Sequence, residues 1–233
     1  MSELPTSYPK NICAYCGSTF GLNNDHIPPK NLFKKPYSQL ITVKACKACH
    51  SRTSKDDEYF LPKICLLVDG NSHPDARAAM GSVFRSLNRT EAPGLREQFF
   101  ADLKYLNLMT PPVILVNVLG FNVDIVRIRL VVERVIRGLY FAETKKPLGL
   151  TIKVQVYTPA DYEVQPSDVR TQLKNIISPL TAMQPKIIGN NVFLYRHYVV
   201  PEDPIVSVWG ISFYQQVPFF VTTGKTTLPT TTS

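Results

Sequence analysis

Residues 46–50 read CKACH, and residues 13–17 read CAYCG. In each stretch two residues separate two cysteines, a spacing that forms a tight turn and presents two sulfur atoms to one metal ion. Two such pairs are typical of a structural zinc site. The alternatives are a redox-active cysteine pair and a chance spacing. The fifth cysteine, Cys65, stands in the apolar run ICLLV and is predicted to be buried. The predicted zinc ligands are Cys13, Cys16, Cys46 and Cys49.

The composition is that of an ordinary globular protein. The chain has 233 residues, of which 44% are hydrophobic and 19% charged, enough for one large core or two smaller ones. The first residues lack the apolar segment of a signal peptide, and no apolar run reaches the length of a membrane span. We therefore expect a cytoplasmic protein with no membrane partner. Thiols stay reduced in the cytoplasm, which favours zinc over disulfides.

The chain is basic, with a formal net charge of +8. Residues 1–65 carry nine Lys and Arg against five Asp and Glu. A basic excess favours a polyanionic partner, of which nucleic acid is the commonest, and DNA is preferred here over RNA.

Between the cysteine pairs, residues 23–30 read NNDHIPPK, in which Asp25 and His26 are adjacent. Taken alone, these residues are typical of a turn. The whole order, CAYCG…NDHIPPKNLF…LITVKACKACHSRTSKDDEYF, resembles the four-cysteine form of the HNH nuclease family, which has the ββα-metal fold. The resemblance covers about residues 10–60 and rests on the two cysteine pairs, the DHxxP core and the His that follows the last cysteine.

The resemblance implies a catalytic centre beside the zinc site. His26 would be the general base, because imidazole accepts a proton from water near neutral pH. Asp25 and His50 would hold a separate divalent ion, Mg²⁺, Mn²⁺ or another, for which a carboxylate is a suitable ligand. The family has an orienting Asn on the second strand. This sequence departs from that pattern, and Gln39 or Ser38 is the candidate for that catalytic position.

Lysines surround the predicted centre. Either they contact the phosphate backbone or they form a solvated face. The resemblance places Lys55 about where such nucleases carry a basic residue. The candidate nucleic-acid contacts are Lys30, Lys34, Lys35, Lys47 and Lys55.

Beyond this region the pattern predicts a larger α+β domain. One helix is expected after a capping Ser72, a second through GLREQFFADLKYLNL, a third from Asp124 to about Thr144, and a fourth in PSDVRTQLKNIISPL. Strands are expected in TPPVILVNVLG and LTIKVQVY, followed by three antiparallel strands in NVFLYRHYVV, PIVSVWGISFY and QVPFFVTT. The fold class is thus α+β. The predicted divisions are a ββα-metal zinc module at 1–62, an α+β domain at 63–224 and a disordered Thr-rich tail at 225–233.

For two groups of side chains, the sequence allows two interpretations each. The helix ending near Thr144 is apolar yet carries four arginines, which either form ion pairs, such as a ladder of Arg129, Glu133 and Arg137, or project toward a polyanion through Arg127 and Arg134. The aromatic set is either sheet core or a base-stacking surface. It consists of Tyr195, His197, Trp209, Phe213 and Tyr214.

The resemblance therefore implies a metal-dependent endonuclease, a hydrolase acting on phosphodiester bonds of DNA. A restriction or phage-defence role fits a small protein of this kind with a large accessory domain, but the sequence does not show that role. The alternatives are a zinc-stabilised nucleic-acid-binding protein with an inactive centre and an interaction protein whose zinc is only structural. The larger domain would recognise the target, a protein partner or a second copy of the chain.

Overall fold

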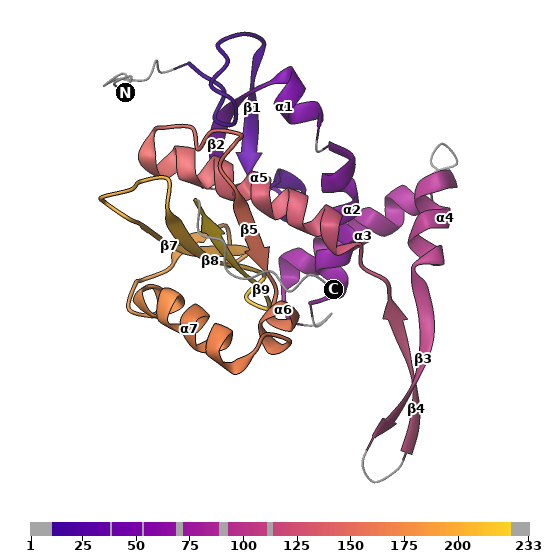
Figure 1. Cartoon of the computed structure of the whole chain (residues 1–233). Coiled ribbons are helices and arrows are strands. Elements are labelled where there is room, and N and C mark those ends of the chain that lie inside the picture. The colour runs from indigo at the N-terminus through magenta and orange to yellow at the C-terminus, as the bar shows by residue number, and fades with distance from the viewer. Residues whose placement is uncertain are drawn as a thin grey trace.

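The chain combines helices with antiparallel sheets, so the predicted α+β class is confirmed (Figure 1). The structure is a computed structural model that describes residues 11–37, 39–52, 54–68, 72–88, 93–110 and 114–224. Within these residues, no helix is long and apolar enough to cross a membrane. The predicted tail at 225–233 lies outside the described residues.

The N-terminal part is a hairpin followed by helices. Strand β1 (Leu22–Ile27) pairs with β2 (Ile41–Cys46), and the short 3-10 helix η1 (Lys30–Leu32) lies in the connection. Cys46 ends β2 and is also the N-cap of α1 (Lys47–Ser51), which is followed by α2 (Ser54–Leu66). The chain order β, β, α is thus present at residues 22–66.

The C-terminal part is a five-stranded antiparallel sheet in the order β5-β9-β8-β7-β6. The three predicted strands are confirmed as β7 (Phe193–Val199), β8 (Ser207–Phe213) and β9 (Val217–Thr223). Strand β5 (Val154–Tyr157) is shorter than predicted, because residues 149–152 turn before it, and β6 (Lys186–Ile188) was not predicted.

Helix α5 (Ile125–Thr144) joins the two parts. It lies between the β1–β2 hairpin and one face of the five-stranded sheet, whereas α6 (Pro159–Glu163) and α7 (Ser167–Thr181) cover the other face (Figure 1). Asp124 caps α5 by accepting hydrogen bonds from the N–H groups of Val126 and Arg127, as the predicted start requires.

A glycine lets α5 approach the hairpin closely. A Cβ on Gly138 would lie 2.7 Å from the side chain of Ile27 in β1. One buried apolar cluster therefore continues from Ile27 through Val135 of α5 to Trp209 of β8. Helix α2 runs through residue 62, where the predicted division falls, and the two-domain division stays a prediction.

Two predicted boundaries are wrong. The helix expected through GLREQFFADLKYLNL ends at Ala101 as α4 (Pro93–Ala101), because the following residues pair as β3 (Leu103–Thr110) with β4 (Ile114–Phe121). This hairpin projects from the body of the molecule (Figure 1). Helix α3 (Pro74–Leu87) is capped by His73, whose Nδ1 accepts from the Asp75 N–H at 3.2 Å, rather than by Ser72.

The aromatic set belongs mainly to the core, so the base-stacking interpretation is wrong for its buried members. Trp209 and Phe213 are fully buried, Tyr195 and Tyr214 nearly so. His197 is half-buried and stacks on Trp209, with ring centroids 4.7 Å apart. The buried indole and hydroxyl groups find partners, as at Tyr195, which donates to Glu143 at 2.6 Å.

Candidate functional site

The two cysteine pairs meet at one point. The turn before β1 brings Cys13 and Cys16 to the junction of β2 and α1, where an Ala14 N–H to Lys44 carbonyl bond of 2.8 Å holds the turn against β2. All four sulfur atoms lie within 4.8 Å of one another, and Cys16 Sγ lies 3.7 Å from Cys46 Sγ. Sulfurs on a ZnS₄ tetrahedron with bonds of about 2.3 Å stand about 3.8 Å apart, so the spacing fits zinc.

The backbone favours thiolate at one of these ligands. The N–H of Cys49 donates to the sulfur of Cys46 and lowers the pKa of Cys46 to about 7. Burial raises the pKa of the neighbouring Cys49 well above its ordinary value. A bound cation would remove the cost of bringing such thiols together as thiolates. Among the described side chains, this is the only group of three or more His, Cys, Asp or Glu close enough to hold one ion.

The side chains of Asp25 and His26 project from opposite faces of β1. The strand is regularly paired there, with Asp25 opposite Val43 and His26 opposite Thr42. Asp25 is buried, 5% exposed, on the face turned toward α5, whereas His26 is half-exposed. The imidazole of His26 forms no hydrogen bond with any described residue.

One oxygen of Asp25 is engaged twice. Its Oδ2 accepts a hydrogen bond from the Tyr15 hydroxyl at 2.6 Å and from Arg134 Nη1 at 3.3 Å. Burial, followed by the charge of Asp25, raises the pKa of Tyr15, so the phenol remains a donor. Within the described part of the chain, no hydrogen bond reaches Oδ1 of Asp25, which leaves that oxygen for another partner.

Arg134 of α5 joins a second carboxylate to the first. Its Nη2 lies 2.5 Å from Oδ1 of Asp57 on α2, and the Arg134 side chain is only 6% exposed. Burial raises the pKa of Asp57 to about 6, against the lowering effect of Arg134 and of His50, while Asp25 raises it further. Asp25, His50 and Arg134 thus all lie within electrostatic reach of Asp57.

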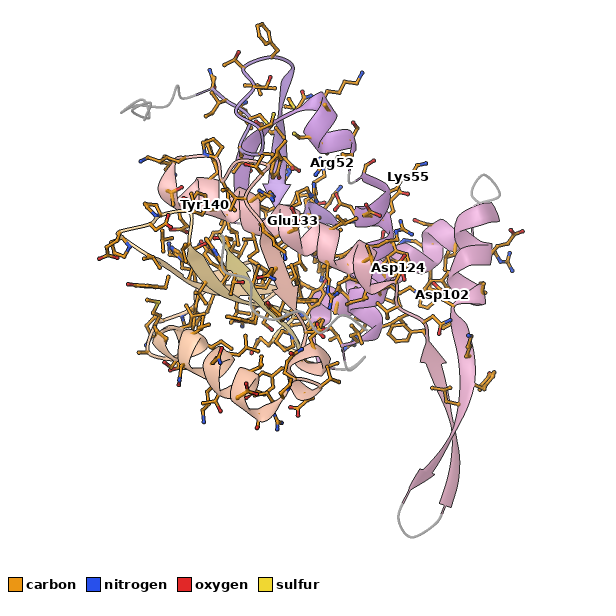
Figure 2. The ribbon with its side chains drawn as sticks, viewed as in Figure 1. Arg52, Lys55, Asp102, Asp124, Glu133 and Tyr140 are labelled. Atoms are coloured by element: carbon orange, nitrogen blue, oxygen red, sulfur yellow. The ribbon has the colours of Figure 1, made fainter. Side chains whose placement is uncertain are left out.

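His50 stands on α1, directly after the last zinc ligand. It is half-buried, and its Nδ1 is fully buried without a hydrogen-bond partner in the described structure. A hollow of about 80 Å³ lies between α1–α2 and α5, and His50 is not among the residues that line it. Arg52 on the α1–α2 segment and Glu133 on α5, both labelled in Figure 2, line it together with Tyr15, Cys49, Asp56 and Arg134.

Gln39, the described candidate for the orienting residue, does not lie on the second strand. Gln39 precedes β2, is exposed, has a left-handed backbone (φ 57°) and forms no hydrogen bond to His26 in the described structure. Ser38 lies outside the described residues. The residue of β2 opposite His26 is Thr42, whose side chain leaves the same face. The sequence could have indicated Thr42 only if the hairpin register were known.

The five predicted lysines are exposed. Lys55 lies in the first turn of α2 (Figure 2), where its carbonyl accepts a hydrogen bond from Arg127 Nη2 at 2.8 Å and its side chain is exposed. Exposure of these lysines agrees equally with a phosphate-contacting surface and with a solvated face. The lysines are Lys30, Lys34, Lys35, Lys47 and Lys55.

The arginines of α5 are paired rather than projecting. Arg127 bonds Asp56 at 2.8 Å, and the adjacent Asp57 takes Arg134. The predicted ladder is present only between Glu133 and Arg137, because Arg129 bonds Asp161. The sequence contained part of the signal: two arginines seven residues apart in an apolar helix need acidic partners, but nothing in it singled out Asp56 and Asp57 among its 18 Asp and Glu.

No protein-family model, curated protein or solved structure matches this chain. The function must therefore be argued from the residues themselves.

Proposed function

We propose that the chain is a metal-dependent nuclease that hydrolyses phosphodiester bonds, preferentially of DNA. The observation that carries the proposal is the arrangement around the four cysteines. They join the β1–β2 hairpin to α1, and this frame presents Asp25 and His26 on β1 and His50 on the turn of helix that follows the last cysteine.

His26 is suited to remove a proton from water. Its ring is half-exposed and has no hydrogen-bond partner among the described residues, so it is accessible to substrate and solvent. Imidazole is the side chain that most often serves as a general base in hydrolysis. Thr42, opposite on β2, is the nearest strand residue whose hydroxyl can orient that ring.

Asp25 and His50 would hold the catalytic divalent ion. Oδ1 of Asp25 and Nδ1 of His50 have no hydrogen-bond partner in the described structure and could each coordinate a metal ion. A carboxylate oxygen and an imidazole nitrogen suit a hard or borderline cation. When bound, such an ion neutralises charge on the scissile phosphate and on the leaving oxygen. Tyr15 and Arg134 hold the Asp25 carboxylate in place through its other oxygen.

A second candidate function is a zinc-stabilised nucleic-acid-binding protein without catalysis. Its support is the same Arg134 contact, because a guanidinium already neutralises both Asp25 and Asp57. In this case the lysines would bind the phosphate backbone, and the centre would serve only to attach α5 to the hairpin.

The deciding experiment compares the wild type with His26→Ala on plasmid and linear DNA, with Mg²⁺, Mn²⁺ or other divalent ions added. Asn24→Ala is the matched control, since Asn24 lies on the same face of β1 two residues away. The nuclease proposal expects cleavage by the wild type and by Asn24→Ala, and loss of at least about a hundredfold in rate for His26→Ala.

Equal inertness of all three proteins on DNA, RNA and modified DNA would contradict the nuclease. If the same proteins still bound DNA in a salt-dependent manner, the non-catalytic candidate would be supported. Cleavage that persists at the wild-type rate in His26→Ala would assign the base to another residue.

A further inference from the structure

A cavity of about 410 Å³ lies between α7 and the sheet face that is turned away from α5. Its size is that of pockets which take small molecules, and most of its lining is apolar. None of the residues of the proposed nuclease centre lines it.

The floor of the cavity is one row of residues across four strands. Arg196 on β7 pairs with Gly210 on β8, Gly210 pairs with Phe220 on β9, and Phe220 pairs with Tyr157 on β5. Cross-strand partners share a face, and all four residues line the cavity. The rings of Tyr157 and Phe220 are stacked, with centroids 5.8 Å apart.

Gly210 keeps the middle of this row open. Because it has no side chain, bare backbone separates the Arg196 guanidinium from the two rings. A Cβ at this position would meet only Leu180 of α7, at 3.5 Å, so the gap is not required by tight packing. The floor is therefore a flat strip with a cation at one end and aromatic rings at the other.

Arg196 lacks an acidic partner within the part of the chain that the structure describes. Among the described residues it forms no ion pair, and its Nε is buried without a hydrogen bond. Arg196 is half-exposed and its charge is not already neutralised by a described carboxylate, so it remains accessible to an anion that enters the cavity. The neighbouring row adds a hydroxyl that is free of hydrogen bonds to described residues, that of Ser212, opposite Leu194.

We propose that this cavity binds a nucleotide, with its phosphate on Arg196 and its base on the strip formed by Gly210 and Phe220. A planar base fits over bare backbone beside stacked rings, and a guanidinium binds phosphate through two parallel N–H donors. Ser212 can bond the edge of the base. The nucleotide is either a free molecule or one turned out of a nucleic-acid strand, because both present the same ring and phosphate.

The test is a binding titration by calorimetry, without added divalent ion so that no cleavage contributes. Ligands are the mononucleoside monophosphates, their nucleosides, inorganic phosphate, decanoate, and a duplex with one mismatched base pair beside its matched control. We expect saturable binding of at least one monophosphate, with its nucleoside at least about tenfold weaker. Preference for the mismatched duplex over the monophosphates would assign the turned-out nucleotide as the source.

Variants locate the binding in the cavity. Arg196→Met should reduce the affinity for the monophosphate at least tenfold and abolish its advantage over the nucleoside. Gly210→Val should abolish binding of both the monophosphate and the nucleoside, because the branched side chain would cover the strip. Gly210→Ala should fold and bind with intermediate affinity, because its methyl group would make only an ordinary contact with Leu180. Arg170→Met on the outer side of α7 removes the same charge outside the cavity lining and should change nothing.

Three results would overturn the proposal. They are binding of decanoate but of no nucleotide, unchanged nucleotide binding in a folded Gly210→Val, and absence of binding to every ligand in the panel. None of these results bears on cleavage by the His26 centre, which is measured separately.

Discussion

Arg134 is a buried cation between two carboxylates. Its side chain is 6% exposed, and its two terminal nitrogens bond Asp25 on β1 and Asp57 on α2. Burying such a group is tolerable only while every charge has its partner, and removal of the central cation leaves two carboxylates unpaired. The same residue supports α5 against the hairpin and fixes the orientation of Asp25.

Arg134→Met is therefore expected to destabilise the protein by about 3–5 kcal/mol, as read from urea unfolding with zinc held constant. Arg127→Met is the matched control, because Arg127 lies one heptad earlier on α5, is itself more exposed (24% against 6% for Arg134) and pairs with one carboxylate, Asp56. That variant should lose about 1 kcal/mol or less. Replacing Asp57 with Asn in the Arg134→Met background should recover part of the loss. Equal effects of the two arginine variants would contradict the shared buried centre.

At this scale, sequence reasoning identified the residue types better than their partners. The four cysteines were predicted correctly as one group, because the Cys-x-x-Cys spacing fixes local geometry whatever the rest of the chain does. Tyr15 was missed because its bond to Asp25 depends on how the turn at residues 13–17 folds against β1. Asp57 was missed because its bond to Arg134 depends on how α2 and α5 pack. Thr42 was missed because register cannot be read without knowing where the hairpin connection ends.

Among the elements, the β1–β2 hairpin would gain most stability from a metal ion held by the four cysteines. It is two-stranded, and two strands alone are marginal in water. Its support comes from the four cysteines on one side and α5 on the other.

Chelation of zinc should therefore unfold the hairpin and α1 before the five-stranded sheet. The measurement is one zinc per chain by metal analysis, followed by near-UV circular dichroism and amide exchange of residues 11–52 after chelator is added. Cys46→Ser should lose the zinc. Cys65→Ser changes a cysteine outside the group and should keep it. A folded, metal-free wild type would refute the zinc assignment.

Helices and strands were predicted correctly where the hydrophobic periodicity was strong. The prediction failed where a helix passes into a strand with no Gly or Pro at the boundary. The helix that begins after Asp124 and the strands β7, β8 and β9 were predicted from their patterns. The end of α4 was missed, because ADLKYLNL carries no Gly or Pro and its pairing with β4 overrides its helical preference.

For the whole molecule, the basic charge predicts how binding to nucleic acid responds to salt. If the lysines beside the hairpin contact phosphates, the double substitution Lys34→Gln and Lys35→Gln should weaken DNA binding. It should also reduce the slope of log K against log salt by up to about 2, because two counterions fewer are released. Fluorescence anisotropy with a labelled duplex at several salt concentrations measures both.

A matched double substitution, Arg170→Gln and Lys174→Gln, removes the same charge from α7 and should leave the slope unchanged. Equal loss for both pairs would show that only the net charge of the protein matters, and that the lysines beside the hairpin form a solvated face.

Gly138 has a consequence for anyone who wishes to study the zinc-bearing part alone. The close approach of α5 to Ile27 means that the hairpin is completed by a helix some eighty residues further along the chain. A fragment ending at residue 62 would cut α2 in its second half, uncover Phe60 and remove the cation that balances Asp25 and Asp57. The working unit for transplantation, circular permutation or minimisation must therefore retain both the hairpin and α5.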